Sequence, residues 1–212
     1  MNIAERADRY SKIFPDRPPL IAFSTAGQTW ITGTWLIGSC YANPNPLYGA
    51  YPHGYLDRVH AMFPDARNVL HAFSGGLTTQ LACSAAWGSN EPPEGCSMAL
   101  VDLHGPDQGR HPTWQGSIED FCEIPENQKR FDLVLVDPPY SEADAQKYST
   151  SMINRRKITH CLREITSLHG NMIWLDQVWP MFRKSEWNCW GQIGLVRSTN
   201  HRVRLVTCFQ AI

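Results

Sequence analysis

The sequence predicts an α/β protein with a doubly wound, mostly parallel sheet that helices cover on both faces. Short segments of continuous apolar residues alternate along the chain with segments of helical periodicity, which is typical of parallel strands buried on both faces. The last two apolar segments, 191–197 and 203–209, are instead joined by a short polar connection around Asn200. This spacing predicts a hairpin that places one antiparallel strand at the end of the sheet.

The first part of the chain carries weaker signals. Residues 2–14 are predicted to form a short helix that stops before Pro15, because proline cannot continue a helix interior. Residues 18–54 are rich in Gly, Pro, Asn, Trp and Tyr and predict only strand and loop. A helix is expected from Pro52 to Phe63, where apolar residues recur near helical spacing.

Four central strands follow, and each ends at a glycine-rich turn or an aspartate. The first, Asn68–Phe73, leads into Ser74-Gly75-Gly76 and then a helix from Thr78 to Trp87. The other three end at acidic residues: Met98–Val101 at Asp102, Phe131–Val136 at Asp137, and Met172–Leu175 at Asp176. Because ligands bind beyond the carboxyl ends of the strands in such sheets, these four ends are the expected site.

The helix before the last of these strands is predicted from one apolar face. This face contains Ile158, Cys161, Leu162, Ile165 and Leu168. Gly170 is expected to be its C-cap, because glycine commonly ends a helix in the left-handed conformation.

Composition favours one medium-sized soluble domain over residues 1–212. No apolar run approaches the ~20 residues that span a bilayer, and the start MNIAERADRYSKIF has charges where a signal peptide would be apolar. The seven cysteines are scattered without a CxxC pair, which argues against a metal site or a disulfide framework. We therefore expect a cytoplasmic protein with no bound metal and no membrane contact.

Charge is distributed unevenly along the chain. The net charge is −1, but the segment from Lys147 to the C-terminus has ten Lys or Arg against three acidic residues, a net charge of +7. Solvated helix and strand faces explain any single charge equally well. The whole set is better explained by a polyphosphate partner such as nucleic acid.

Asp137-Pro138-Pro139-Tyr140 is the segment with the clearest chemical meaning. Two prolines make a stiff, extended turn, and neither has an N–H, so their carbonyls can face a ligand. The carboxylate of Asp137 and the carbonyl of Pro138 could accept both protons of an exocyclic amine on a base, while Tyr140 offers a face for stacking. A turn with a capping aspartate is the alternative. The position of this segment directly after a buried strand favours the catalytic interpretation.

The segment FDLVLVDPPY resembles the catalytic motif of class I S-adenosylmethionine-dependent amino-methyltransferases, especially the N6-adenine DNA enzymes of small phage and prophage type. VLHAFSGGL (69–77), MALVD (98–102) and the terminal hairpin extend the resemblance over residues 52–212. The resemblance implies a Rossmann-like, seven-stranded sheet. It also implies a catalytic core at residues 52–212, with residues 1–51 as an N-terminal extension.

The resemblance also implies which residues bind S-adenosylmethionine. The methionine end would lie on the loop after the first central strand, the ribose on the acid after the second, and the adenine near the start of the next helix. Two departures are His71, where the family usually has an acid, and Leu77, where it usually has glycine. Together with Asp137 itself, the expected cofactor-binding residues are Tyr48, Phe73, Ser74, Gly75, Gly76, Asp102, Leu103, Ser117 and Ile118.

Two polar segments are expected to contact the substrate. Asn154, Arg155, Arg156 and Lys157 open a helix, where cations oppose the helix dipole and a phosphate ligand would explain them; a solvated first turn is the alternative. Asn200 and His201 lie in the hairpin connection, where turn chemistry explains asparagine equally well.

The expected function is methylation of adenine N6 in DNA. An RNA enzyme that acts on adenine N6 or guanine N2 is the nearest alternative, since similar Asp-Pro-Pro-aromatic loops serve both. Cytosine N4 enzymes usually have Ser at the position of Asp137, and protein glutamine methyltransferases usually have Asn there. A catalytically silent subunit that binds cofactor and nucleic acid is an alternative of a different class.

Overall fold

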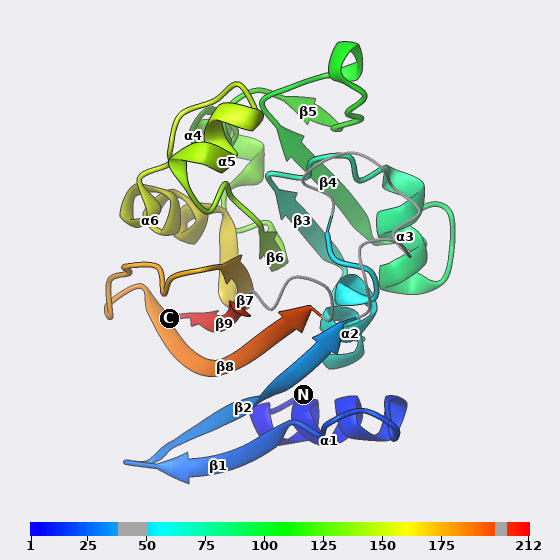
Figure 1. Ribbon diagram of the computed structural model, residues 1–212, viewed down its shortest axis with the longest axis vertical. Helices are drawn as coiled ribbons and strands as arrows, with labels where there is room; N and C mark the ends of the chain where they lie inside the picture. The colour runs from blue at the N-terminus through cyan, green and yellow to red at the C-terminus, as the bar shows by residue number, and fades with distance from the viewer. Residues whose placement is uncertain (38–50, 198–202) are drawn as a thin grey trace.

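One mixed sheet of nine strands runs through the described part of the protein (Figure 1). The structure, a computed structural model, describes residues 1–37, 51–197 and 203–212. The sheet order is β1-β2-β8-β9-β7-β6-β3-β4-β5. The strands are β1 (Ile21–Thr25), β2 (Gln28–Ile37), β3 (Asn68–Ala72), β4 (Ser97–Asp102), β5 (Trp114–Gln115), β6 (Phe131–Val136), β7 (Thr166–Asp176), β8 (Trp187–Arg197) and β9 (Val203–Ala211).

The strand directions confirm the predicted α/β class. β2, β8, β7, β6, β3, β4 and β5 run in one direction, while β1 and β9 run against them. β9 lies between β7 and β8 and is antiparallel to both. The two C-terminal strands therefore pair antiparallel as predicted, but the predicted place of the antiparallel strand at the end of the sheet is wrong, because β8 and then β2 and β1 extend the sheet beyond β9.

The predicted count of seven strands is wrong, because the N-terminal segment adds to the sheet. β1 and β2 form a hairpin, and β2 pairs in parallel with β8 from Ile31 to Ile37. β2 alternates buried Ile31, Trp35 and Ile37 with more exposed residues. This alternation, broken by threonine and glycine, is a weaker signal than the continuous apolar runs of the central strands.

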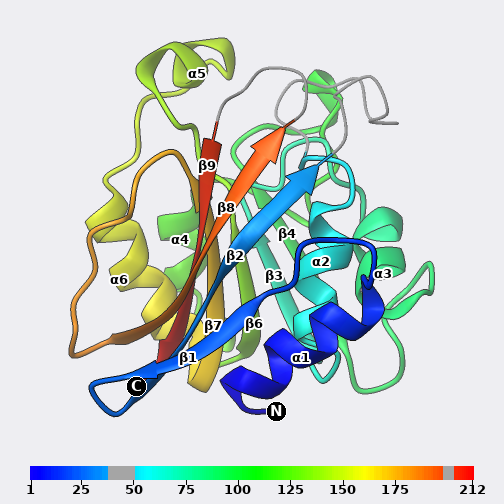
Figure 2. The same ribbon diagram turned by 60° about the horizontal axis from the view of Figure 1, so that its bottom comes forward.

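Helices cover the central strands on both faces. Figure 2 shows α4 and α6 on one side of the sheet and α1, α2 and α3 on the other. A separate apolar cluster lies under each group. The α-helices are α1 (Ile3–Ile13), α2 (Tyr55–Met62), α3 (Thr79–Trp87), α4 (Ile118–Glu123), α5 (Glu142–Lys147) and α6 (Arg155–Ile165), and the 3-10 helices are η2 (Pro106–Gln108) and η3 (Pro125–Asn127).

The predicted end of α6 is wrong. The helix ends at Ile165 and β7 begins at once with Thr166, so that Leu168 is exposed and Gly170 lies within the strand. Thr166 pairs with Phe131 of β6 before the register shifts. A Cβ at Gly170 would lie 2.9 Å from the carbonyl oxygen of Ser167. Gly170 therefore allows close backbone packing inside β7 and does not cap a helix.

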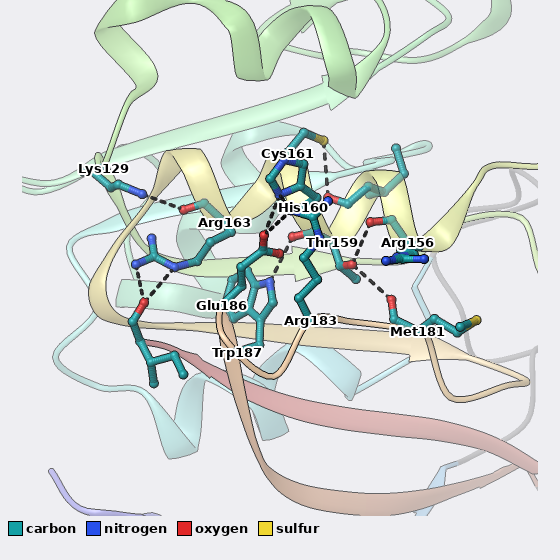
Figure 3. Close-up of polar contacts among 12 residues, drawn as sticks. Lys129, Arg156, Thr159, His160, Cys161, Arg163, Met181, Arg183, Glu186 and Trp187 are labelled. Atoms are coloured by element: carbon teal, nitrogen blue, oxygen red, sulfur yellow. Dashed lines mark hydrogen bonds and ion pairs between the residues drawn. The ribbon is translucent and has the colours of Figure 1, made fainter.

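The connection between β7 and β8 is attached to α6 (Figure 3). Thr159 Oγ1 donates to the carbonyl of Met181 at 3.1 Å, and Trp187 Nε1 donates to the carbonyl of Thr159 at 2.9 Å. His160 Nδ1 lies 2.7 Å from Glu186 Oε1. These contacts hold the later part of the connection and the start of β8 against α6.

Among the described residues, the helices are all too short or too polar to cross a lipid bilayer. The same residues contain no group of three or more His, Cys, Asp or Glu placed to hold a metal ion.

Candidate active site

The four strand ends singled out in the sequence lie side by side. β7, β6, β3 and β4 are consecutive neighbours in the sheet, and all four run in the same direction. Their carboxyl ends therefore bring Asp176, Asp137, the Ser74–Gly76 turn and Asp102 to one edge. This is the edge where open α/β sheets bind ligands.

Residues 137–140, the candidate reaction loop (called the reaction loop below), are attached to the sheet. Pro138 and Pro139 are buried, while Asp137 and Tyr140 are partly exposed. The Asp137 N–H donates to the carbonyl of Ala72 on β3, and the Tyr140 hydroxyl donates to Asp137 Oδ1. The loop thus presents a carboxylate and an aromatic ring that are already held together.

Burial raises the pKa of Asp137 to about 7. Arg204 and the hydrogen bond from Tyr140 lower this pKa, while the nearby Asp176 raises it further. Burial also holds the pKa of Tyr140 well above its ordinary value, so the phenol remains a donor. Asp137 therefore changes between its acid and carboxylate forms close to neutral pH.

Arg155 connects the reaction loop to the end of β7. Its Nε donates to Asp176 Oδ2 at 2.7 Å, and its Nη2 lies 3.2 Å from Asp176 Oδ1 and 3.3 Å from the carbonyl of Tyr140. Asp176 is fully buried and also accepts from Trp174 Nε1 at 3.1 Å. The Arg155 guanidinium, which the sequence predicted to contact phosphate, thus binds protein groups within the site.

The turn after β3 is tightly coiled beside Asp102. Phe73 and Gly75 have φ angles of 61° and 58°, a conformation that is unusual for a phenylalanine. The Gly75 N–H donates to Asp102 Oδ2 at 2.8 Å and the His104 N–H donates to Oδ1 at 3.0 Å. Arg110 Nε also lies 3.8 Å from Oδ1 as an ion pair. A carboxylate has about four acceptor positions, so Asp102 retains hydrogen-bonding capacity for two further donors.

His71 is fully buried where the resemblance would place an acid. Burial, reinforced by His60, holds the pKa of His71 well below its ordinary value, so the ring is neutral. Its Nδ1 lies 3.4 Å from the Tyr51 hydroxyl, and Tyr51 stacks on Tyr55 at 5.3 Å. Asp137 contributes to raising the pKa of both tyrosines, which places this aromatic cluster beside the reaction loop.

The remaining cofactor candidates occupy varied positions. Ser117 is the N-cap of α4, where its Oγ accepts from the Asp120 N–H at 3.1 Å. Ile118 is buried in the core, while Leu103 is 47% exposed beside Asp102. Tyr48 lies outside the described residues.

The substrate candidates on α6 also have local roles. Asn154 is the N-cap, whose Oδ1 accepts from the Lys157 N–H at 3.1 Å, and Lys157 Nζ lies 3.7 Å from Glu119. Arg156 is exposed. Asn200 and His201 lie outside the described residues.

Arg204 is a site residue that sequence reasoning did not single out. It lies on β9, and its guanidinium carbon is 4.4 Å from the centre of the Tyr140 ring. The only signal in the sequence was a charged residue between Val203 and Leu205 at the start of an apolar strand. Its position over the reaction loop depends on β9 lying beside β7, which no local pattern reveals.

Comparison with solved structures identifies the fold. A candidate S-adenosylmethionine-dependent methyltransferase from Streptococcus mutans is 13% identical, with a TM-score of 0.50 over 90% of this chain and 55% of that chain. TrmN from Thermus thermophilus is 12% identical, with a TM-score of 0.50 over 74% of this chain and 48% of that chain. The chain has a methyltransferase fold.

Sequence comparison adds no family assignment. No protein-family model matches the chain, and neither does any curated protein sequence. A candidate methyltransferase from Escherichia coli, yhhF, is 15% identical with a TM-score of 0.47 over 78% of this chain and 90% of that chain. At these identities the methyltransferase likeness describes architecture, and the chemistry has to be argued from the site.

Proposed function

We propose that this protein transfers a methyl group from S-adenosylmethionine to the N6 amino group of adenine in DNA. The observation that carries the proposal is the reaction loop, which holds a carboxylate and an aromatic ring together beside the turn after β3. Within a methyltransferase fold, this places an acceptor for amine protons next to the strand ends where the cofactor is expected. The choice of adenine N6 in DNA follows from the resemblance of FDLVLVDPPY to that class of enzyme.

The groups around the β3 turn fit the cofactor. Asp102 has acceptor capacity for two ribose hydroxyls after its backbone hydrogen bonds. The Ser74 hydroxyl is buried at 2% exposure without a partner among the described residues, which suits a polar ligand atom. We propose that the methionine end of the cofactor is contacted by Phe73, Ser74, Gly75 and Gly76, and that Leu103 packs on the adenine of the cofactor.

The reaction loop provides the chemistry for the acceptor. Asp137 and the Pro138 carbonyl accept the two amine protons, which concentrates the lone pair on nitrogen. S-adenosylmethionine, held by the residues around the β3 turn, would supply an electrophilic methyl group and a sulfide leaving group for this nitrogen. Asp137, with its pKa of about 7, can take the proton that the nitrogen then releases. Tyr140 stacks on the base, an interaction worth ~1–3 kcal/mol.

Arg155 has a positioning role in this proposal. By bridging Asp176 and the Tyr140 carbonyl, it fixes the aromatic ring relative to the end of β7. Accurate placement matters because small displacements of reacting groups cost large factors in rate.

The decisive experiment identifies the product. The protein is incubated with donor carrying a labelled methyl group and with separate DNA and RNA pools, which are digested to nucleosides and analysed by mass spectrometry. Labelled N6-methyladenine in the DNA pool is the expected result. Asp137→Ala is the control, which should lose the label. Label confined to RNA would replace DNA by RNA as substrate, and cofactor binding without any transfer would indicate a silent binding subunit.

A further inference from the structure

Two arginines lie at the edge of the site, and the proposed chemistry assigns neither of them a contact with the substrate. Arg197 ends β8 and Arg204 is near the start of β9. Leu195 pairs with Arg204 and Val196 with Val203. Since side chains alternate along a strand, Arg197 and Arg204 share one face as diagonal neighbours, with roughly 7–8 Å between their backbones.

The shared face is the one that carries the reaction loop. Val206 and Cys208 belong to the apolar cluster under α1, α2 and α3, as do Ile193 and Leu195. Arg204 continues the row of Val206 and Cys208, and Arg197 continues that of Ile193 and Leu195. The contact of Arg204 with the Tyr140 ring at 4.4 Å confirms this placement for Arg204.

Both guanidinium groups lack hydrogen-bonding partners in the part of the chain that the structure describes. The Nε of each is buried and unpaired, and neither side chain forms an ion pair there. Arg155 differs because it binds Asp176. Arg58 also has a buried, unpaired Nε, but its two Nη atoms donate to the carbonyls of Gly54 and Leu36. Buried donors are normally paired, so two unpaired guanidinium groups on one face indicate a missing acceptor.

Acidic and basic residues lie on different strands along the edge of the site. Asp102, Asp137 and Asp176 lie at the ends of β4, β6 and β7, while Arg197 and Arg204 lie on β8 and β9. Arg110 and Arg155 offset the charges of Asp102 and Asp176, so an anionic group would be attracted to the side of β8 and β9, where the two arginines form no such ion pair among the described residues. Such an arrangement favours one orientation of a substrate that has a neutral base attached to a charged group.

We propose that Arg197 and Arg204 form an anion subsite that binds a phosphate adjoining the nucleotide to be methylated. This inference rests on the proposed function and extends it, because it requires a base within a polynucleotide and not a free base or nucleoside. The planar guanidinium fork matches phosphate oxygens in pairs. Arg204 would then hold the phosphate while it lies against Tyr140, whose other face remains for the base.

The test measures how binding of a single-stranded, adenine-containing oligodeoxynucleotide depends on salt. Fluorescence anisotropy is used for the wild type, Arg197→Gln, Arg204→Gln and the control Lys12→Gln, which changes an exposed cation on α1. Each arginine variant should bind the oligonucleotide ~10-fold or more weakly at low salt. The negative slope of log K against log salt should become shallower by about 0.7 in each variant. In the control variant the slope should change by much less.

A second measurement leaves the protein unchanged. Each phosphate flanking the adenine is replaced in turn by a neutral methylphosphonate. One replacement should weaken wild-type binding about as much as the arginine substitutions do, while the two arginine variants should respond little to it, as expected for partners in one contact. If neither replacement affects the wild type, the subsite is overturned even if a variant misfolds.

The remaining outcomes separate this inference from the proposed function. Calorimetric titration with S-adenosylmethionine should give the same affinity for the arginine variants and the wild type. If both variants transfer methyl groups and their salt slopes equal that of the wild type, the subsite alone is overturned. The same holds if an acidic peptide competes for binding more strongly than the unlabelled oligonucleotide does. Failure of the wild type to bind S-adenosylmethionine would instead overturn the proposed function.

Discussion

At the scale of single residues, Asp137 combines two properties that normally exclude each other. It is a carboxylate in a poorly hydrated position, which costs free energy, yet the proposed chemistry needs its charged form. Tyr140 and Arg204 partly compensate, since both lower its pKa while burial raises it to about 7. Such a perturbed group at a strand end is a common property of functional sites.

Removal of the Asp137 carboxylate should slow methyl transfer strongly while the fold survives. A lost hydrogen bond to a charged acceptor, ~1.5–3 kcal/mol, predicts at least ~10–100-fold slower transfer for Asp137→Ala. Asp107→Ala, in the 3-10 helix η2, is a control that should keep the wild-type rate. Single-turnover kinetics with saturating cofactor make the measurement. Wild-type turnover in Asp137→Ala would show that its role is misassigned.

The titration of Asp137 predicts opposite effects of pH on activity and stability. Activity should fall as pH drops below about 7, by up to ~10-fold per unit, because only the carboxylate accepts an amine proton. The folded-state pKa lies above the ordinary aspartate value of 3.8, so the folded protein binds more protons than the unfolded chain. Asp137 therefore lowers stability as pH rises from about 4 to about 7.

Asp137→Asn removes this titration and separates the two effects. The variant should transfer methyl groups about as slowly as Asp137→Ala, but it should be more stable than the wild type above pH 7, and the difference in stability should disappear below pH 4. Thermal unfolding over this pH range measures it. Equal stability of the two proteins at pH 8 would contradict the elevated pKa.

At the scale of elements, one junction determines the geometry of the site. The first turn of α6, the reaction loop after β6 and the end of β7 meet at Arg155 and Asp176. α6 ends at Ile165 and β7 begins at Thr166 without a loop between them, so helix and strand cannot move independently. Arg155 thus connects three elements through one side chain.

Substitution of Arg155 should affect both stability and the rate constant. Arg155→Gln leaves the buried Asp176 carboxylate without its ion pair, which should cost roughly 3 kcal/mol, reduced somewhat because the Arg155 side chain is 21% exposed. The expected kinetic signature is a lower kcat with little change in KM for the cofactor. Arg155→Lys should restore part of both quantities.

The double variant Arg155→Gln/Asp176→Asn controls for lost charge pairing. It should be more stable than Arg155→Gln alone, because the unpaired carboxylate is gone. If its kcat nevertheless stays low, Arg155 positions the loop; full recovery of kcat would reduce Arg155 to a structural ion pair.

At the scale of the whole molecule, the N-terminal segment completes the sheet and its core. β2 covers the edge of β8, which would otherwise be exposed to association with other chains. Trp35 is fully buried between Tyr10 of α1 and Tyr55 of α2, with ring-centre distances of 5.8 and 6.0 Å. Tyr55 in turn stacks on Tyr51 beside the site, so the segment also supports the aromatic cluster near Asp137.

Trp35→Ala should therefore destabilise the entire protein. Loss of a buried tryptophan costs ~3–5 kcal/mol, measured as the free energy of unfolding in urea. Phe23→Ala on the exposed face of β1 is the matched control and should change stability by less than about 0.5 kcal/mol. A loss below about 1 kcal/mol for Trp35→Ala would mean that the N-terminal segment is a separable extension.

Local patterns in the chain suffice to predict the class of fold, the order of the central strands and helices, and Asp137 to Tyr140 as the candidate reaction loop. These follow from local patterns: apolar runs in β3, β4, β6 and β7, and the consecutive residues Asp137 to Tyr140. Three contacts are visible only in the folded protein: β2 adjoins β8, Arg155 binds Asp176, and Arg204 covers one face of Tyr140. Such contacts join residues far apart in the chain, and they depend on strand order and register, which local periodicity does not encode.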